Sequence, residues 1–180
     1  MLVVGSMHGN EPAGMAVVAA LRRTHPHEDL WLVPTLNPDG IAHDTRQNAD
    51  GVDLNRNFPT GWRPIGPAWS VYASGPRPFS EPETRAARTL VARIHPRVTI
   101  WLHQHMDLVW AYGRSSKAGH RYAELAGMRY RHWPWLDGSS TNWLNHLPGG
   151  EQSFTVELPA GTLSRAQVAR QVRAVLGVVR

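Results

Sequence analysis

The first 35 residues carry a strand–turn–helix–strand pattern, which restricts the fold more than any other feature of the chain. The apolar run 2–4 predicts a short buried strand, the glycine-rich segment 5–14 predicts a turn, and residues 15–23 predict a helix. The apolar run 30–35 predicts a second strand that is buried on both faces. A strand, a helix and a second strand in this order form a parallel unit with a right-handed crossover. The sequence therefore predicts an α/β protein.

Further along the chain, short apolar or alternating runs predict strands and longer periodic runs predict helices. Strands are expected at 98–102, 108–112 and 153–158, and helices at 80–93, 116–127 and 164–178. The helix at 80 is predicted to start with a capping box formed by Ser80 and Glu83. The segment 61–78 has no period and is expected to form an ordered loop wall. We expect one domain, residues 1–180, with a mostly parallel mixed sheet and helices on both faces.

The composition excludes cysteine as a metal ligand and argues against nucleic acid and membranes as partners. The chain has no cysteine, so any metal must be bound by His, Asp or Glu. The net charge of +5 comes from arginine, but the arginines are scattered and no nucleic-acid motif is present, so no nucleic-acid partner is expected. The planar guanidinium group suits carboxylates, which favours an anionic small substrate. No apolar run approaches the ~20 residues that span a bilayer, so no membrane partner is expected.

The start of the chain leaves its cellular location open. Met1 opens directly on a strand without a signal peptide, so a soluble cytoplasmic protein is expected for the chain as given. The abrupt start also suggests that residues are missing upstream, and a removed leader would instead make the protein secreted. The sequence indicates no oligomeric state.

Two metal-binding residue types lie three positions apart in the first glycine-rich turn. His8 and Glu11 follow the first predicted strand, where an imidazole nitrogen and a carboxylate oxygen can converge on one cation. Zinc in catalytic sites takes three such ligands and keeps one position open. The alternative is structural: His8 caps the following helix and Glu11 complements its dipole. His103 and Glu157 also lie at predicted strand ends, where open α/β sheets bind ligands, and this favours the metal site.

Six segments occur together in one order across almost the whole chain. They are His8-Gly9-Asn10-Glu11, Asn37-Pro38-Asp39-Gly40, residues 51–57, Ser80-Glu81-Pro82-Glu83, Ile100-Trp101-Leu102-His103 and Val156-Glu157-Leu158. In these segments the sequence resembles the M14 family of zinc carboxypeptidases. The resemblance implies that His8, Glu11 and His103 bind one Zn²⁺ per chain and leave a fourth position for water. It also implies that Glu157 is the general base, which takes a proton from that water and passes one to the leaving amine.

The resemblance assigns three further residues to the substrate. Asn55 and Arg56 match the pair that grips the terminal carboxylate of a peptide, which a guanidinium fork holds with two hydrogen bonds. The alternative for Arg56 is a buried ion pair with Asp53. Arg46 matches the arginine that stabilises the oxyanion. Its alternative is a surface salt bridge.

A second histidine nearby leaves two candidates for the third metal ligand. His105 lies two residues after His103 and would point to the same side if the strand continued, so either residue could bind the metal. The position after the apolar run and the family pattern favour His103. His105 is then expected in the pocket.

One part of the chain departs from the digestive members of the family. Those enzymes place a substrate-contacting tyrosine shortly before the catalytic glutamate, but residues 132–156 contain no tyrosine. Asn142 and Trp143 occupy this region, and we expect them to contact the substrate instead. The departure favours an atypical peptide over the trimming of ordinary proteins.

The endings of two segments narrow the expected activity. Residues 138–143 and 157–161 look most like the murein peptide amidase branch, which cuts the γ-D-glutamyl–diaminopimelate bond of cell-wall peptides. The resemblance thus implies a zinc-dependent amidase or carboxypeptidase that acts near the carboxyl end of a short anionic peptide. One alternative is an N-acyl amino-acid deacylase of the succinylglutamate desuccinylase and aspartoacylase type, which also resembles residues 8–11 and 54–56. Another is a non-catalytic zinc-containing peptide-binding module, against which the presence of Glu157 argues.

Overall fold

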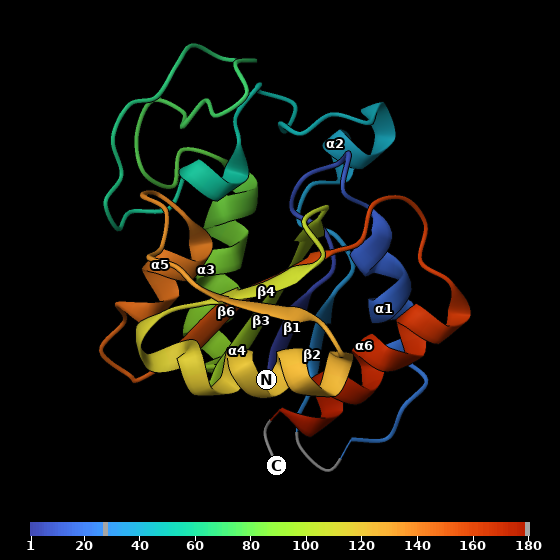
Figure 1. Cartoon of the computed structure of the whole chain (residues 1–180). Helices are drawn as coiled ribbons and strands as arrows, with labels where there is room; N and C mark the ends of the chain where they lie inside the picture. The colour runs from blue at the N-terminus through green and yellow to red at the C-terminus, as the bar shows by residue number, and fades with distance from the viewer. Residues whose placement is uncertain (27–28, 179–180) are drawn as a thin grey trace.

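The computed structural model describes residues 1–26 and 29–178, which form a six-stranded sheet with helices against both faces (Figure 1). The strands are β1 (Leu2–Val4), β2 (Trp31–Val33), β3 (Val98–Gln104), β4 (Leu108–Ala111), β5 (Arg129–His132) and β6 (Gln152–Leu158). The α-helices are α1 (Ala13–Leu21), α2 (Pro38–His43), α3 (Pro82–Ile94), α4 (Ser116–Ala126), α5 (Ser140–Asn145) and α6 (Arg165–Gly177). Short 3-10 helices span Leu54–Arg56 and Gly113–Ser115. Within the described ranges, every helix is too short or too polar to cross a bilayer.

The strand order is β2–β1–β3–β6–β4–β5, and β2, β1, β3 and β6 all run parallel. β4 lies antiparallel to β6 and parallel to β5. The predicted α/β fold with a mostly parallel mixed sheet is therefore confirmed. Because β1, β3 and β6 are adjacent and parallel, their carboxyl ends open at the same edge of the sheet, where such folds bind ligands.

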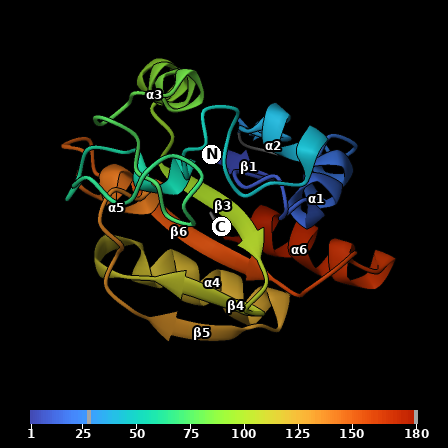
Figure 2. The ribbon, with the colours of Figure 1, turned by 90° about the horizontal axis from the view of Figure 1, so that it is seen from above.

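Helices cover both faces of the sheet, as predicted (Figures 1 and 2). On one face, α1, α4 and α6 bury apolar side chains that include Val17, Tyr122 and Val175. On the other face, α3 and α5 pack with residues after the first 3-10 helix, and this second core includes Val91, Leu144 and Phe58. Burial of each such side chain stabilises the fold by about 1.5–3 kcal/mol.

The two cores meet on the central strands, where alternate residues face opposite sides. On β3, Ile100 and Leu102 belong to the first core and Trp101 belongs to the second. His103 lies two residues after Trp101 and therefore points to the side of α3 and α5. On β6, Phe154 and Val156 face the first core, which directs the following Glu157 to the same side as His103. The burial pattern of the strands thus aims both polar side chains at one place.

Two local predictions are wrong. β2 is an edge strand with a partner only in β1, and Trp31 is 42% exposed, so this strand is not buried on both faces. The capping box at the start of α3 does not form. The helix begins one residue later, with Glu81 as N-cap and Pro82 in the first turn, because proline is well suited to the first helical position. The Ser80 hydroxyl hydrogen-bonds the Glu81 carboxylate instead.

Three elements arise in segments for which the sequence analysis predicts neither a helix nor a strand. α2 follows Asn37, whose side chain accepts a hydrogen bond from the Gly40 amide. α5 follows Ser139, whose hydroxyl accepts one from the Asn142 amide. β5 is largely exposed and lacks the polar–apolar alternation of a half-buried strand, so only its pairing with β4 reveals it.

Candidate metal centre and active-site cleft

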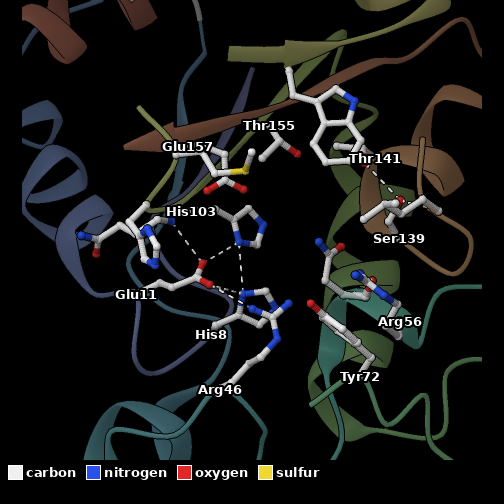
Figure 3. Close-up of a pocket in the computed structure, with 16 residues that line it drawn as sticks. His8, Glu11, Arg46, Arg56, Tyr72, His103, Ser139, Thr141, Thr155 and Glu157 are labelled. Atoms are coloured by element: carbon white, nitrogen blue, oxygen red, sulfur yellow. Dashed lines mark hydrogen bonds and ion pairs between the residues drawn. The ribbon is translucent and has the colours of Figure 1, made fainter. Parts of the chain in front are cut away.

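A cleft of about 280 Å³ lies beyond the carboxyl ends of β1, β3 and β6. Its walls come from segments far apart in the sequence (Figure 3). The polar and charged residues of its lining are His8, Glu11, Arg46, Asn55, Arg56, Tyr72, His103, Gln104, His105, Ser139, Thr141, Thr155 and Glu157, and its apolar lining is Met106, Trp110 and Leu136. All of the predicted site residues except Asn142 and Trp143 therefore line one cleft.

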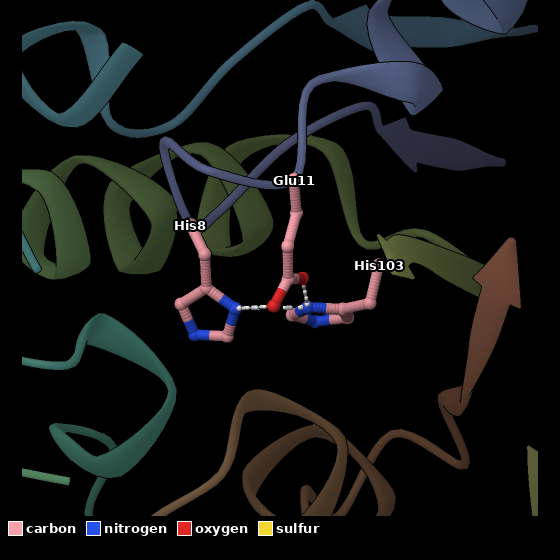
Figure 4. A group of neighbouring side chains, drawn as sticks. All are labelled: His8, Glu11 and His103. Carbon is pink, nitrogen blue, oxygen red and sulfur yellow. Dashed lines mark hydrogen bonds and ion pairs between the residues drawn. The ribbon is translucent and has the colours of Figure 1, made fainter. Parts of the chain in front are cut away.

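Three buried side chains converge at the bottom of the cleft (Figure 4). His8 Nδ1 lies 3.0 Å from Glu11 Oε1, and His103 Nδ1 lies 2.8 Å from Glu11 Oε2. The two Nδ1 atoms are 3.2 Å apart, and one ligand atom from each residue lies within 4.8 Å of the others. His105 is not part of this group; it is exposed at the rim, because β3 ends at Gln104.

The first turn is held so that His8 and Glu11 face each other. The Glu11 amide donates to the His8 carbonyl at 3.0 Å, and the Ser6 hydroxyl donates to the same oxygen at 2.9 Å. Gly9 packs directly on the backbone of Gly40, where a Cβ atom would lie 1.8 Å from the Gly40 carbonyl carbon. Any side chain at position 9 would therefore push the turn away from α2 and separate His8 from Glu11.

Asp53 fixes the orientation of His8 from behind. Its Oδ1 lies 2.9 Å from His8 Nε2, and its Oδ2 accepts two hydrogen bonds from Arg46, at 3.0 and 2.9 Å. Arg46 also donates to Glu11 Oε1 at 3.1 Å. Arg46 is thus not a surface salt bridge, since its side chain is only 22% exposed and joins two buried carboxylates. Partners of this kind orient metal-ligating histidines and carboxylates.

The electrostatics of the group favour charged forms. Burial alone would raise the pKa of Glu11, but His8 and the hydrogen bond from His103 outweigh it and hold the pKa well below its usual range. The pKa of Asp53 is depressed for the same reason, through His8 and then Arg46. Burial opposes the charged form of His8, yet Asp53 and Glu11 raise its pKa above the usual value. The site is therefore built for a positive charge between buried carboxylates.

The donor set fits a zinc ion. When His8 donates its Nε2 hydrogen to Asp53, its Nδ1 presents a lone pair to Glu11, and two such electron-rich atoms 3.0 Å apart require a proton or a cation between them. Two imidazole nitrogens and one carboxylate oxygen form a usual catalytic zinc set, which leaves a fourth position open. The cleft side of the group supplies the space for that position.

Glu157 lies beside this group without belonging to it. Glu157 is the register partner of His103 on the adjacent strands β3 and β6. Figure 3 shows its carboxylate directed into the cleft next to His103. Its Oε2 is buried and has no hydrogen-bond partner within the described residues. A buried carboxylate oxygen without a donor is costly, and because Glu157 lines the cleft, a proton or a ligand in the cleft can reach this oxygen.

Asn55 and Arg56 are neighbours in the lining of the cleft, and Figure 3 shows Arg56 across the cleft from Glu157. The Asn55 side-chain oxygen accepts from the amide and the hydroxyl of Ser140, at 3.0 and 3.1 Å, which ties this part of the lining to α5. Arg56 donates to the Asn55 carbonyl at 2.7 Å. Asp53 pairs with Arg46, and among the described residues Arg56 forms no ion pair, so the alternative of an Arg56–Asp53 pair is wrong.

Asn142 and Trp143 do not line the cleft, so the expectation that they contact the substrate there is wrong. Trp143 is 6% exposed and stacks on Phe58 in the second core, with ring centroids 5.2 Å apart. Asn142 lines a separate cavity and donates to the Thr60 carbonyl. Because α5 is a helix, Ser139 and Thr141 turn toward the cleft instead, and the sequence analysis predicts no helix in this segment.

Tyr72 and Gln104 are among the further cleft residues that the sequence analysis did not assign to the site. Tyr72 lies in the segment 61–78, where nothing in the sequence indicates the direction of one side chain. Gln104 connects Glu11 to the start of α1. Its backbone amide donates to Glu11 Oε2 at 3.2 Å, and its side-chain oxygen accepts from the Ala13 backbone amide. Its place directly after His103 was the available signal.

Known proteins share both the sequence and the fold. A family model described as zinc carboxypeptidase, peptidase M14, matches residues 1–132. Murein peptide amidase A of Vibrio campbellii is 30% identical over 180 residues, which cover 88% of this chain and 68% of that protein. Murein peptide amidase A of Escherichia coli K12 is 34% identical over 121 residues, which cover 60% of this chain and 50% of that protein. The match thus spans about half the length of the Escherichia coli relative.

A solved structure gives the same result for the fold. The crystal structure of murein-tripeptide amidase from Escherichia coli O157 superposes with a TM-score of 0.80 at 26% identity. The superposition covers 99% of this chain and 79% of that protein. The similarity therefore extends over nearly all of the sheet, the helices and the cleft.

Proposed function

The chain belongs to the peptidase M14 family of zinc carboxypeptidases, and we propose that it hydrolyses the amide bond before the carboxyl-terminal residue of a short anionic peptide. As the bond we propose the γ-D-glutamyl–diaminopimelate bond of murein peptides. Membership of the family supports a metallopeptidase activity; this activity, the substrate and the roles of the residues are the proposal. The observation that carries it is the convergence of His8, Glu11 and His103 beside the unpartnered carboxylate oxygen of Glu157.

His8, Glu11 and His103 would hold one zinc ion through the two Nδ1 atoms and the Glu11 carboxylate. Zinc bound there supplies a Lewis acid, which lowers the pKa of a water toward about 7 and polarises the scissile carbonyl. Asp53 keeps the Nε2 hydrogen on His8, so that its Nδ1 stays free for the metal.

Glu157 would act as the general base. Its Oε2 has no donor among the described residues, so it can take a proton from the attacking water and later deliver it to the leaving amine. Its position on β6, one strand from His103, supports this role, because the carboxylate lies beside the three converging side chains without belonging to their group.

Arg56 and Asn55 would hold the terminal carboxylate of the peptide. Arg56 has no ion-pair partner among the described residues, and a bidentate carboxylate from the substrate would supply one. This contact sets the register of the peptide, so that its last amide bond lies over the metal ligands. Arg46 has five N–H donors and uses three for Asp53 and Glu11, which leaves two for the oxyanion.

The names of the relatives support the choice of substrate. The Vibrio campbellii and Escherichia coli relatives are murein peptide amidases, and the similarity covers 88% of this chain for the first and 60% for the second. The hydroxyls of Ser139, Thr141 and Thr155 give the cleft a polar wall, which suits a leaving residue with a polar side chain such as diaminopimelate.

A substrate comparison tests the proposal. The zinc-loaded protein is incubated with L-Ala-γ-D-Glu-diaminopimelate, an N-blocked ordinary dipeptide, and N-succinylglutamate, and the released amines are measured. Release of diaminopimelate from the tripeptide, with little reaction of the other two, is the expected result. Turnover of N-succinylglutamate instead would identify a deacylase. Tight binding of the tripeptide without any cleavage would identify a binding module.

A further inference from the structure

Tyr72 stands between two arginines at the mouth of the cleft (Figure 3). Its ring centroid lies 5.5 Å from the guanidinium carbon of Arg46 and 5.0 Å from that of Arg56. Both distances are within the ~6 Å over which a cation is attracted to an aromatic ring. One ring therefore contacts the arginine that braces the metal ligands and the arginine that faces the substrate.

The backbone around Tyr72 is firmly anchored although its side chain is 50% exposed. The next two residues, Ala73 and Ser74, are each only 1% exposed. The Ala73 carbonyl accepts from the Asp53 amide at 2.8 Å, and the Ser74 carbonyl accepts from the Asn57 side chain at 2.8 Å. The segment that contains Asp53 and Arg56 thus holds the backbone next to Tyr72, whose ring lines the cleft.

The two arginines differ in how their charge is balanced. Arg46 contacts the carboxylates of Glu11 and Asp53, whereas Arg56 pairs with no carboxylate in the described part of the chain. Burial lowers the pKa of Arg56; the charge of Asp53 opposes this effect, and that of Arg46 adds to it. The guanidinium groups of Arg46 and Arg56 lie against the same ring and repel each other. A neutral ring with a negative face between them therefore stabilises their spacing.

We propose that Tyr72 is a positioning residue, whose ring holds Arg56 at a fixed distance from Arg46 and so sets the cleft to accept a free terminal carboxylate. This inference rests on the proposed function, because the carboxylate belongs to the peptide substrate. The ring face carries the effect and the phenol hydroxyl does not. The scissile bond lies between the metal ligands and Arg56, so an error in this spacing weakens substrate binding before it affects the chemical step.

Three variants separate the ring from the hydroxyl. Tyr72→Phe keeps the ring face, Tyr72→Leu removes it, and Val71→Ala changes an exposed neighbour outside the lining of the cleft. For the murein tripeptide, we expect Tyr72→Leu to raise KM about tenfold with kcat nearly unchanged, and the Phe variant to stay within about twofold of the parent. The Val71→Ala variant should match the parent in both constants.

Binding measurements show whether the effect acts on the carboxylate. The zinc-loaded Glu157→Gln protein, with and without Tyr72→Leu, is titrated calorimetrically with the tripeptide and with its carboxyl-terminal amide. We expect Tyr72→Leu to weaken binding of the acid about tenfold and to leave binding of the amide unchanged. Equal losses for acid and amide would show that Tyr72 acts on general packing, and the proposal would be wrong. A Phe variant as damaged as the Leu variant would assign the role to the hydroxyl and overturn it as well.

A readout without substrate separates this inference from the proposed function. The side-chain N–H resonance of Arg56, assigned through Arg56→Lys, should carry a ring-current shift that persists in Tyr72→Phe and disappears in Tyr72→Leu. If the parent protein binds acid and amide equally, the proposed carboxylate recognition fails even when this shift is present. If the shift is absent from the parent, the contact between Tyr72 and Arg56 does not exist, and the further inference fails by itself.

Discussion

His103 and Glu157 are register partners on the adjacent parallel strands β3 and β6. Side chains at paired positions leave a sheet on the same face, so the imidazole and the carboxylate point into the same cleft. Glu157 nevertheless stands outside the cluster of His8, Glu11 and His103. This relationship separates a residue suited to bind a metal from one suited to move a proton, and it leads to the first prediction.

Glu157→Gln should abolish most of the turnover and leave zinc binding intact. The amide cannot take a proton from water, and loss of a general base reduces kcat by roughly a hundredfold to ten-thousandfold. Metal content per chain and kcat on the murein tripeptide are the two measurements. Glu151→Gln is the matched control, since Glu151 is a buried glutamate next to the same strand but outside the cleft. Retained activity in the Glu157 variant would remove Glu157 from the mechanism.

His103→Ala and His105→Ala should differ completely in metal content. His103 supplies one of the converging nitrogens, whereas His105 is exposed after the end of β3. We expect the His105 variant to keep about one zinc per chain and the His103 variant to lose it, together with the activity. Chelation of the parent protein should abolish activity, and added zinc should restore it. Zinc retained by His103→Ala and lost from His105→Ala would reverse the ligand assignment.

Zinc should also stabilise the fold. Three buried polar side chains converge around one position, and a ligand that binds only the native state at a hundred times its Kd adds about 2.7 kcal/mol to the free energy of unfolding. The melting temperature of the chelated parent should therefore rise on addition of zinc. The melting temperature of His103→Ala should not respond, and an equal response in this variant would place the stabilising zinc elsewhere.

Asp53→Asn should weaken zinc binding without removing a ligand. Asp53 accepts from His8 Nε2 and from Arg46, so the variant loosens His8 and frees Arg46 from its second carboxylate. Loss of such an orienting partner reduces metal affinity roughly tenfold to a hundredfold. Competition with a fluorescent zinc chelator measures the change. Asp50→Asn, at an exposed aspartate three residues away, should have the affinity of the parent; a parent-like affinity in Asp53→Asn would argue against its orienting role.

Glu83 should make the stability of the protein depend on pH. Burial raises its pKa above the ordinary value of 4.5, although a hydrogen bond from Asn48 opposes the shift. The folded state therefore favours the protonated acid, and the stability that Glu83 contributes is present below pH 4.5 and is lost as the pH rises through the raised pKa. Glu83→Gln is neutral throughout, so its melting temperature relative to the parent should be higher at pH 7 than at pH 4. A relative melting temperature that falls over this interval would contradict the shift.

Much of the candidate site could be predicted because its residues lie next to strongly patterned segments. His8 and Glu11 follow β1, His103 ends β3, and Glu157 ends β6. Apolar runs predict these strands, and parallel strands bring their carboxyl ends to one edge of the sheet. Local sequence therefore suffices to place these four side chains close together.

The partners of the arginines and the lining from α5 could not be predicted in the same way. Asp53 is near both Arg46 and Arg56 in the sequence, and only the folded chain shows that it pairs with Arg46. Trp143 and Thr141 lie two residues apart on a short helix, which buries the first and turns the second to the cleft.

The sequence by itself determined which donors this protein has and at which strand ends they lie, because buried strands leave a clear apolar pattern. Only the tertiary structure decided the lining of the cleft: the contact of Tyr72 with both arginines, the burial of Trp143 and the separation of His105 from the group of His8, Glu11 and His103. Each of these depends on where a segment without a periodic pattern packs against another part of the chain. That packing is a balance of many weak contacts between distant residues, and no local run of amino acids records it.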